Sequence, residues 1–158
     1  MRRAYVAVLA IASLALIAGC DIGGDDQLSK EEFNAKATEI DKRVSDSFDT
    51  VFENLDEKDL RSNKPVSEKT KAALAEAAQT EKDAVAELAD LKPPEEGQAA
   101  VDELVRVAGA QADNLAEAAK NPDLTGKDLE EAFSAEDPEK PITELRELGL
   151  WPQEQNGQ

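Results

Sequence analysis

Apolar residues recur every three or four positions through most of this chain, and this spacing restricts its fold more than any other feature. From residue 29 onward, no stretch alternates apolar and polar residues as a half-buried strand does. A spacing of three and four instead places the apolar side chains on one face of an α-helix. The sequence therefore predicts an all-α fold.

The first predicted helix begins at a capping box. Ser29 is followed three residues later by Glu32, and Leu28 and Phe33 stand at the two positions of a hydrophobic staple. The helical pattern fades near Leu60, before a turn that contains a proline. The apolar stripe of this helix consists of Phe33, Ala37, Ile40, Val44, Phe48, Val51 and Leu55.

Two further long helices are predicted on either side of a pair of prolines. Ser67 is the expected cap of the second helix, which Pro93 and Pro94 end because consecutive prolines cannot continue a helix. Pro94 is well placed to start the third helix, which is expected to stop near Asn121. The stripes are Leu74, Ala78, Glu81, Val85, Leu88 and Leu91, and then Val101, Leu104, Ala108, Ala112, Leu115 and Ala119.

Glu81 is the one acidic residue on the stripe of the second helix. If the two prolines form a hairpin turn, Glu81 and Arg106 lie equally far from it along the chain. An ion pair between them would offset the charge on the packed face. We therefore predict that Glu81 and Arg106 pair across the hairpin.

The C-terminal part predicts two short helices whose combined length nearly matches one long helix. Gly149 stands where the last helix would end in a left-handed C′ residue. The first helix starts at a second staple and box, Leu124, Thr125, Asp128 and Leu129; the break is at Asp137, Pro138 and Pro141; the last helix carries Ile142, Leu145 and Leu148. The predicted architecture is an antiparallel helical bundle of three long helices with a fourth broken into two short ones.

The N-terminus has the features of an export signal. Arg2 and Arg3 precede an uncharged apolar run over residues 4–18, which is shorter than the roughly 20 residues of a membrane-spanning helix. The run ends in Ile-Ala-Gly-Cys at residues 17–20, which resembles the lipobox of bacterial lipoprotein precursors. Cys20 is the only cysteine, so no disulfide within the chain can account for it.

The lipobox resemblance implies cleavage before Cys20 and a lipid on its sulfur. In that family the thiol carries diacylglycerol, and the new amino terminus often receives a fatty acid such as palmitate. We therefore expect a signal peptide at residues 1–19, lipidated Cys20 with a flexible tether at 20–28, a helical domain at 29–151 and a disordered tail at 152–158. The expected location is the extracytoplasmic face of the cell membrane; the alternative is a soluble secreted protein with a free thiol.

The remainder of the chain is similar to small, uncharacterised helical lipoproteins of high-GC Gram-positive bacteria. The similarity lies in the Leu-Ser-Lys-Glu-Glu-Phe opening at residues 28–33 and in Leu-Ala-Asp-Leu-Lys-Pro-Pro-Glu at residues 88–95. Members often have a cysteine in the first helix, which this chain lacks. The resemblance implies no known activity.

Charge and composition exclude several classes of function. The formal net charge is −17, whereas nucleic acids and anionic lipid surfaces are bound by clusters of Lys and Arg. The chain has no histidine, which removes the usual catalytic triads, His-ligated zinc and bis-His haem. No glycine-rich phosphate loop is present. We expect no catalytic residues, cofactor or metal, and a protein that is not an enzyme.

Two local features have both a functional and a structural interpretation. Asn121, Asp123, Thr125 and Gly126 partly imitate the opening of a calcium loop, but the position of its bidentate glutamate is an alanine, so we interpret the segment as a helix cap. Trp151 follows the Gly149 cap, where it is expected to fold back and pack on the helix. The alternative is an exposed anchor for a partner protein.

The sequence thus predicts a membrane-anchored, non-enzymatic binding or scaffold module of the cell envelope that acts through an envelope protein partner. The alternative is a carrier of an apolar ligand between the helices. A closed, alanine-rich seam favours the first function, whereas an apolar cavity of several hundred Å³ favours the second.

Overall fold

A computed structural model describes residues 27–55, 62–134 and 137–153. These residues form five α-helices and one 3₁₀ turn and contain no strand, which confirms the predicted all-α fold. Cys20 and the signal segment lie outside the described residues. The elements are α1 (Lys30–Glu53), α2 (Glu68–Asp90), η1 (Glu95–Gly97), α3 (Gln98–Lys120), α4 (Gly126–Ser134) and α5 (Glu139–Glu147).

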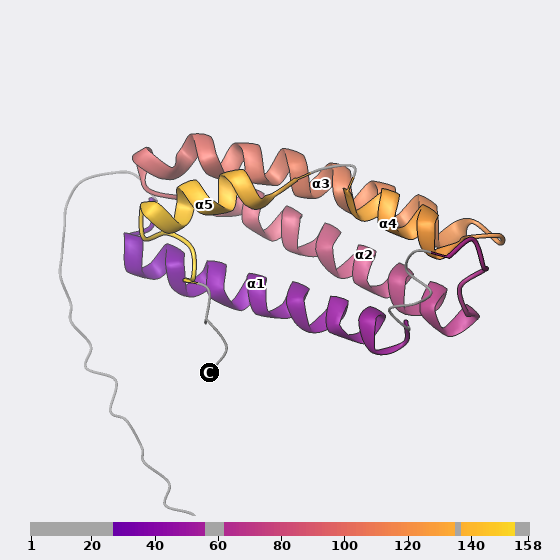
Figure 1. The fold of residues 1–158 in the computed structure, drawn as a ribbon. Helices are drawn as coiled ribbons and strands as arrows, with labels where there is room; N and C mark the ends of the chain where they lie inside the picture. Colours follow the sequence, from indigo (N-terminus) through magenta and orange to yellow (C-terminus); the bar gives the residue numbers. More distant parts are fainter. Residues whose placement is uncertain (1–26, 56–61, 135–136, 154–158) are drawn as a thin grey trace, which may run out of the picture.

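The helices form an elongated stack in which α2 contacts both α1 and α3 (Figure 1). The short helices α4 and α5 follow one another along α3, which contacts both of them. The helices α1, α2 and α3 alternate in direction, and α4 and α5 both run opposite to α3, so the start of α1, the α2–α3 hairpin and the end of α5 lie at one end of the molecule.

Both predicted capping boxes are present. Ser29 accepts a hydrogen bond from the backbone N–H of Glu32, and the Glu32 carboxylate accepts one from the backbone N–H of Ser29. Thr125 and Asp128 make the same reciprocal pair at the start of α4. These hydrogen bonds to Ser29 and Thr125 lower the pKa of both carboxyls, since an ionised carboxylate is the better acceptor. The segment that imitates a calcium loop is therefore a helix cap.

Two helix boundaries differ from the sequence prediction. The helix α1 ends at Glu53 instead of near Leu60, because the backbone carbonyl of its C-cap residue Asn54 accepts a hydrogen bond from the Thr70 hydroxyl and ties the chain to α2. The helix α3 begins at Gln98 instead of at the second proline, because Glu95–Gly97 first make a 3₁₀ turn. The connection between α2 and α3 therefore includes η1 as well as the two prolines.

The C-terminal segment folds back on the rest of the bundle. Pro141 lies within the first turn of α5, so the predicted break there is wrong; a proline at this position needs no intrahelical N–H bond. Gly149 has φ of 74°, as predicted for a C′ residue, and the Leu150 N–H donates to the Leu145 carbonyl at 2.8 Å. Leu150 then packs so closely on Gly97 that a methyl group at residue 97 would collide with it.

The buried apolar residues form two separate clusters along the stack. The first core cluster lies toward the α2–α3 hairpin and consists of Phe33, Ala37, Ile40, Ala84, Leu88, Ala100, Val101, Leu104, Leu145, Leu150 and Trp151. The second core cluster lies toward the opposite end and consists of Val51, Val66, Ala73, Leu74, Ala77, Ala78, Leu115, Leu124 and Leu129. Each large buried side chain contributes roughly 1.5–3 kcal/mol.

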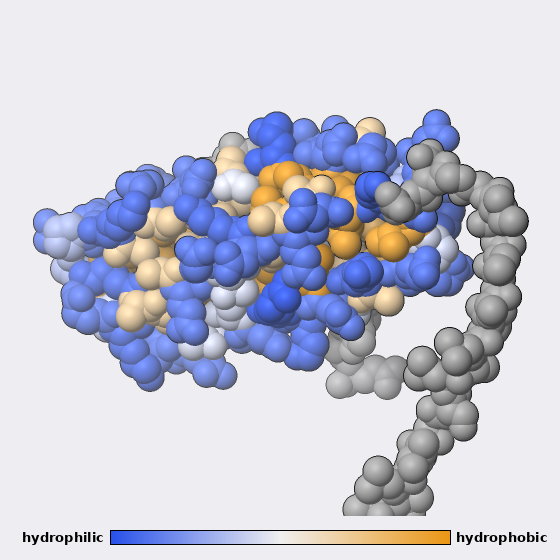
Figure 2. Space-filling model, turned by 180° about the vertical axis from the view of Figure 1, so that it is seen from behind, coloured by the Kyte–Doolittle hydropathy of each residue, from blue (hydrophilic) through white to orange (hydrophobic). Residues whose placement is uncertain are grey.

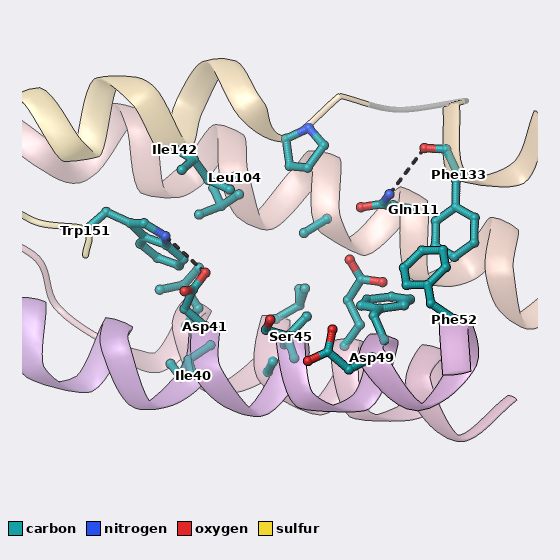
Figure 3. A pocket seen from close by; sticks show the side chains of 18 residues that line it. Ile40, Asp41, Ser45, Asp49, Phe52, Leu104, Gln111, Phe133, Ile142 and Trp151 are labelled. Atoms are coloured by element: carbon teal, nitrogen blue, oxygen red, sulfur yellow. Dashed lines mark hydrogen bonds between the residues drawn. The ribbon is translucent and has the colours of Figure 1, made fainter. Parts of the chain in front are cut away.

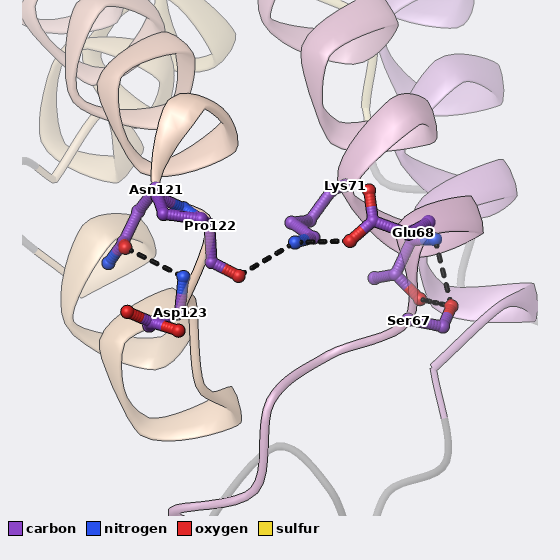
Figure 4. Close-up of polar contacts among 7 residues, drawn as sticks. Ser67, Glu68, Lys71, Asn121, Pro122 and Asp123 are labelled. Atoms are coloured by element: carbon purple, nitrogen blue, oxygen red, sulfur yellow. Dashed lines mark hydrogen bonds and ion pairs between the residues drawn. The ribbon is translucent and has the colours of Figure 1, made fainter.

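A buried cation fastens the start of α2 to the α3–α4 turn (Figure 4). Lys71 is only 9% exposed, and its Nζ donates to the carbonyl of Pro122 at 2.9 Å and pairs with Glu68 at 2.5 Å. Nearby, Val66 N donates to the carbonyl of Leu124 at 2.8 Å. Every polar group named here has a partner, so this end of the bundle is closed.

The surface is dominated by charged residues. Figure 2 shows hydrophilic side chains over most of the face opposite to that of Figure 1, with strongly hydrophobic atoms mainly in the half that holds the start of α1. Exposed ion pairs join neighbouring helices, for example Arg43 with Glu87 and Lys82 with Asp113, and contribute about 1 kcal/mol or less each. Within the described ranges, no helix has the length and apolar character needed to cross a bilayer.

Candidate functional site

A cavity of about 400 Å³ lies where the two core clusters fail to meet. On α2 the second core cluster ends at Ala78 and the first begins at Ala84, and Glu81 stands between them. On α3 the corresponding gap spans Ala108 and Gln111, which also line the cavity. Small side chains and the interruption between α4 and α5 leave this space unfilled.

The walls of the cavity come from every α-helix of the described chain. Figure 3 shows α1 along one side, with Asp41, Ser45 and Asp49 directed toward the opening, and Leu104 and Ile142 facing them across it. The opening is partly exposed to solvent. Apolar lining residues outnumber polar ones; they include Ile40, Val44, Ala84, Val85, Leu88 and Pro138.

Three phenylalanines close one end of the cavity. The ring of Phe133 from α4 meets Phe48 edge-on and stacks on Phe52, with ring centroids 5.6 Å apart in both cases. The Gln111 side chain donates to the Phe133 carbonyl at 3.4 Å and thereby covers a free carbonyl at the end of α4 (Figure 3). Phe52 remains 46% exposed and is the one large apolar side chain on the surface of the described residues.

Trp151 closes the other end. Its indole is only 4% exposed and its Nε1 donates to Asp41 Oδ1 at 3.3 Å (Figure 3). The prediction that Trp151 is packed is confirmed, since the residue is buried in the first core cluster, where its indole bonds to α1. The alternative of an exposed aromatic anchor is wrong because the side chain is buried.

Glu81 is the unusual group of this cavity. The residue is 5% exposed, and its Oε2 atom has no hydrogen-bond partner among the described residues. Burial raises the pKa of this carboxyl to about 7, because a charged group loses its hydration inside an apolar cavity. A buried polar group without a partner destabilises a fold by about 1–3 kcal/mol, and a charged one by more.

The predicted Glu81–Arg106 pair does not form. Arg106 lies on the exposed face of α3 and donates through Nε and Nη2 to the Glu103 carboxylate, at 2.9 and 2.8 Å. These hydrogen bonds lower the pKa of Glu103, whereas the raised pKa of Glu81 comes from burial alone. The error lies in the face and not in the distance from the turn, since Glu81 is on the buried face of α2 whereas Arg106 is on the exposed face of α3.

The electrostatic character of the lining is acidic. Three of the lining residues, Asp41, Asp49 and Glu81, carry carboxyls, and none of the described lining residues is Lys or Arg. The described ranges contain no group of acidic or sulfur ligands arranged to hold a metal ion. A buried carboxyl in an apolar cavity can bind and orient a ligand.

The sequence contains only an indirect sign of this site. Cys20, the only functional residue assigned from the sequence, lies outside the described residues, so its lipidation stays a prediction. The sequence predicts a cavity only as a condition that favours a carrier of an apolar ligand. Its one direct sign was the acidic Glu81 on an otherwise apolar stripe.

Comparisons with known proteins give no further guide. No protein-family model matches the chain, and no significant match was found among curated proteins or solved structures.

Proposed function

We propose that this chain is a lipid-anchored envelope protein whose helical domain binds a small molecule with an apolar body in the central cavity. The proposed architecture is an antiparallel bundle of three long helices, with a fourth helix broken into α4 and α5. The observation that carries the proposal is an apolar cavity of about 400 Å³ that contains a buried carboxyl without a partner. This volume falls in the range of roughly 300–1,000 Å³ typical of small-molecule sites.

The packing of the chain supports binding over a purely mechanical role. A scaffold gains stability from a filled core, whereas this chain keeps Glu81 buried beside an open space at a cost to its own stability. Such an arrangement is typical of a site whose missing contacts come from a ligand. The non-enzymatic role expected from the sequence is retained in this proposal.

Binding can be measured through Trp151, which is the only tryptophan and lines the cavity. We expect 4-phenyl-1-butanol, a small neutral probe, to change its fluorescence saturably in the full chain held in phosphatidylcholine vesicles. Ala108→Phe, which fills the cavity from α3, should abolish the saturable change, whereas Ala99→Phe on the exposed face of α3 should not. Ser45→Phe, at the cavity rim, provides a second block that leaves the core unchanged.

The proposal fails if wild type shows no saturable response, or if Ala108→Phe and Ser45→Phe respond as wild type does.

A second candidate function, docking of an envelope protein partner, is supported by Phe52, which is half-exposed at the aromatic end of the cavity. Phe52→Ser would then weaken capture of that partner in cross-linking experiments.

The membrane anchor rests on the lipobox alone. Mass spectrometry of the mature product should find a chain that begins at Cys20 and carries the mass of diacylglycerol and fatty acid. A free thiol or an intact leader would contradict the anchor, and Cys20→Ser should release the protein from the membrane fraction if the proposal is right.

A further inference from the structure

The cavity contains a strong indication of the kind of molecule that it accepts. Among its polar lining side chains, two have partners within the protein, and one is buried without a partner. Asp41 accepts a hydrogen bond from Trp151, and Gln111 donates one to the Phe133 carbonyl. Glu81 Oε2 is buried and unpartnered.

We propose that the ligand is a small cationic amphiphile, an apolar body with one protonated amine, whose ammonium group pairs with the Glu81 carboxylate. This inference rests on the proposed function and names its ligand class. An ammonium group is a strong hydrogen-bond donor, and a charge-assisted bond to a buried carboxylate is about twice as strong as a neutral one.

The charges around Glu81 exclude an anionic ligand. Asp41 and Asp49 face the cavity from α1, while the lining residues from α4 and α5 carry no charge among the described residues. Lys82, the neighbour of Glu81 on α2, is paired with Asp113 on α3 at 2.6 Å. A fatty acid or phosphate would therefore meet three carboxyls and no cation, which would raise the free energy of the bound state.

A purely apolar ligand is disfavoured for a different reason. It would fill the cavity but leave Glu81 Oε2 without a partner and more completely dehydrated than before. The volume sets the size, since about 400 Å³ accommodates a ring or a short chain and excludes a lipid with two long chains. The phenylalanine rings at one end offer apolar contact for the body and a negative ring face for the cation.

The test compares three molecules that share one body: 4-phenylbutylamine, 4-phenyl-1-butanol and 4-phenylbutyrate. With the full chain in phosphatidylcholine vesicles and Trp151 fluorescence at pH 8, we expect the amine to bind roughly tenfold or more tightly than the alcohol, and the carboxylate to bind least. Glu81→Gln keeps the shape but removes the charge, so it should abolish the preference for the amine and leave the affinity for the alcohol within about threefold.

A matched control separates the cavity from the general acidity of the chain. Glu76→Gln removes the same charge from the exposed face of α2, five residues earlier, and should leave the preference for the amine unchanged. Affinity for the amine should also rise between pH 6 and pH 8, because the amine requires the ionised form of Glu81, whose pKa is about 7. The alcohol should show no such rise.

The outcomes distinguish this inference from the proposed function. Equal binding of amine and alcohol, or a preference that survives Glu81→Gln, overturns the ligand class while the cavity remains a binding site. Tighter binding of the carboxylate overturns it as well. If none of the three molecules responds to Ala108→Phe or Ser45→Phe, the cavity is not the site and both proposals fail.

Discussion

Lys71 and Glu81 lie on the same helix, both are buried and both can carry charge, yet their surroundings are opposite. The Lys71 ammonium reaches the Pro122 carbonyl and the Glu68 carboxylate, so its charge is fully accommodated within the protein. Glu81 has an oxygen with no partner and faces a cavity. A buried charge is tolerated where the fold supplies its partners and destabilises the fold where it does not.

The contrast teaches how to tell a structural polar group from a functional one. At the Lys71 end, the polar contacts tie α2 to the α3–α4 turn, and the apolar residues form a compact cluster. In the middle of the bundle, both the apolar packing and the hydrogen bonding are incomplete at the same place. The candidate site is identified because incomplete packing and incomplete hydrogen bonding occur at the same place.

The largest expected effect on stability comes from a substitution at Glu81. Glu81→Met should raise the free energy of unfolding by about 3 kcal/mol at pH 8, because the variant removes a carboxyl whose pKa burial has raised from 4.5 to about 7. Urea unfolding followed by circular dichroism measures the gain. The exposed control Glu76→Met should change stability by about 0.5 kcal/mol or less.

The same variant has a defined pH dependence. Since the pKa of Glu81 is higher in the folded than in the unfolded chain, wild type loses stability as the pH rises from 4.5 toward 7. The part of the Glu81→Met advantage that comes from titration should therefore be complete above pH 8 and vanish below pH 4.5. An advantage independent of pH would mean that Glu81 does not titrate as proposed.

The next largest effect on stability comes from a substitution at Lys71 and has the opposite sign. Lys71→Met keeps most of the aliphatic stem but loses the hydrogen bond to Pro122, and should lower the free energy of unfolding by about 2 kcal/mol. Lys69→Met, two residues earlier on the exposed face of α2, is the matched control and should be nearly neutral. If Lys71→Met were as stable as wild type, the closed end would not depend on its cation.

A smaller effect sharpens the account of the closed end. Thr70 is 1% exposed and its hydroxyl donates to the Asn54 carbonyl at 3.0 Å. Thr70→Val, which preserves the shape, should lower the free energy of unfolding by about 1 kcal/mol, because that carbonyl then loses its donor. Thermal unfolding beside Thr80→Val, a half-buried control on the same helix, tests this; equal losses in both would remove the assigned role.

The smallest effect concerns the cavity itself. Asp41→Asn replaces a carboxylate that accepts the Trp151 N–H with an amide oxygen that can accept it equally well. We expect a change in unfolding free energy of about 0.5 kcal/mol or less, measured by Trp151 fluorescence in urea. A loss above roughly 2 kcal/mol would show that the charge of Asp41, and not only its oxygen, holds Trp151 in place.

Local features of this fold could be predicted from the sequence because they depend on neighbouring residues. The Ser29 and Thr125 capping boxes and the Gly149 helix end involve residues no more than five positions apart, and all three are present. The buried position of Trp151 followed from its place just after that helix end. In such cases a short pattern contains the whole physical cause.

The cavity and the partner of Arg106 could not be predicted in this way. Equal distance from the turn does not fix which way a side chain faces, and Arg106 lies on the exposed face of α3, where it pairs with Glu103 three residues earlier. The cavity depends on the distance between small residues such as Ala84 and Ala108 on different helices, and on where α4 and α5 separate. A stripe indicates which residues face inward, but not whether the inward-facing atoms meet.

The central claim, that Glu81 is a buried carboxyl whose missing partner is a ligand cation, can be tested most directly by ¹³C NMR titration of its side-chain carboxyl. We predict a midpoint near pH 7 in the free protein and a midpoint shifted to lower pH when 4-phenylbutylamine is bound. A midpoint near 4.5 in the free protein, or one that the amine leaves unchanged, would contradict the account.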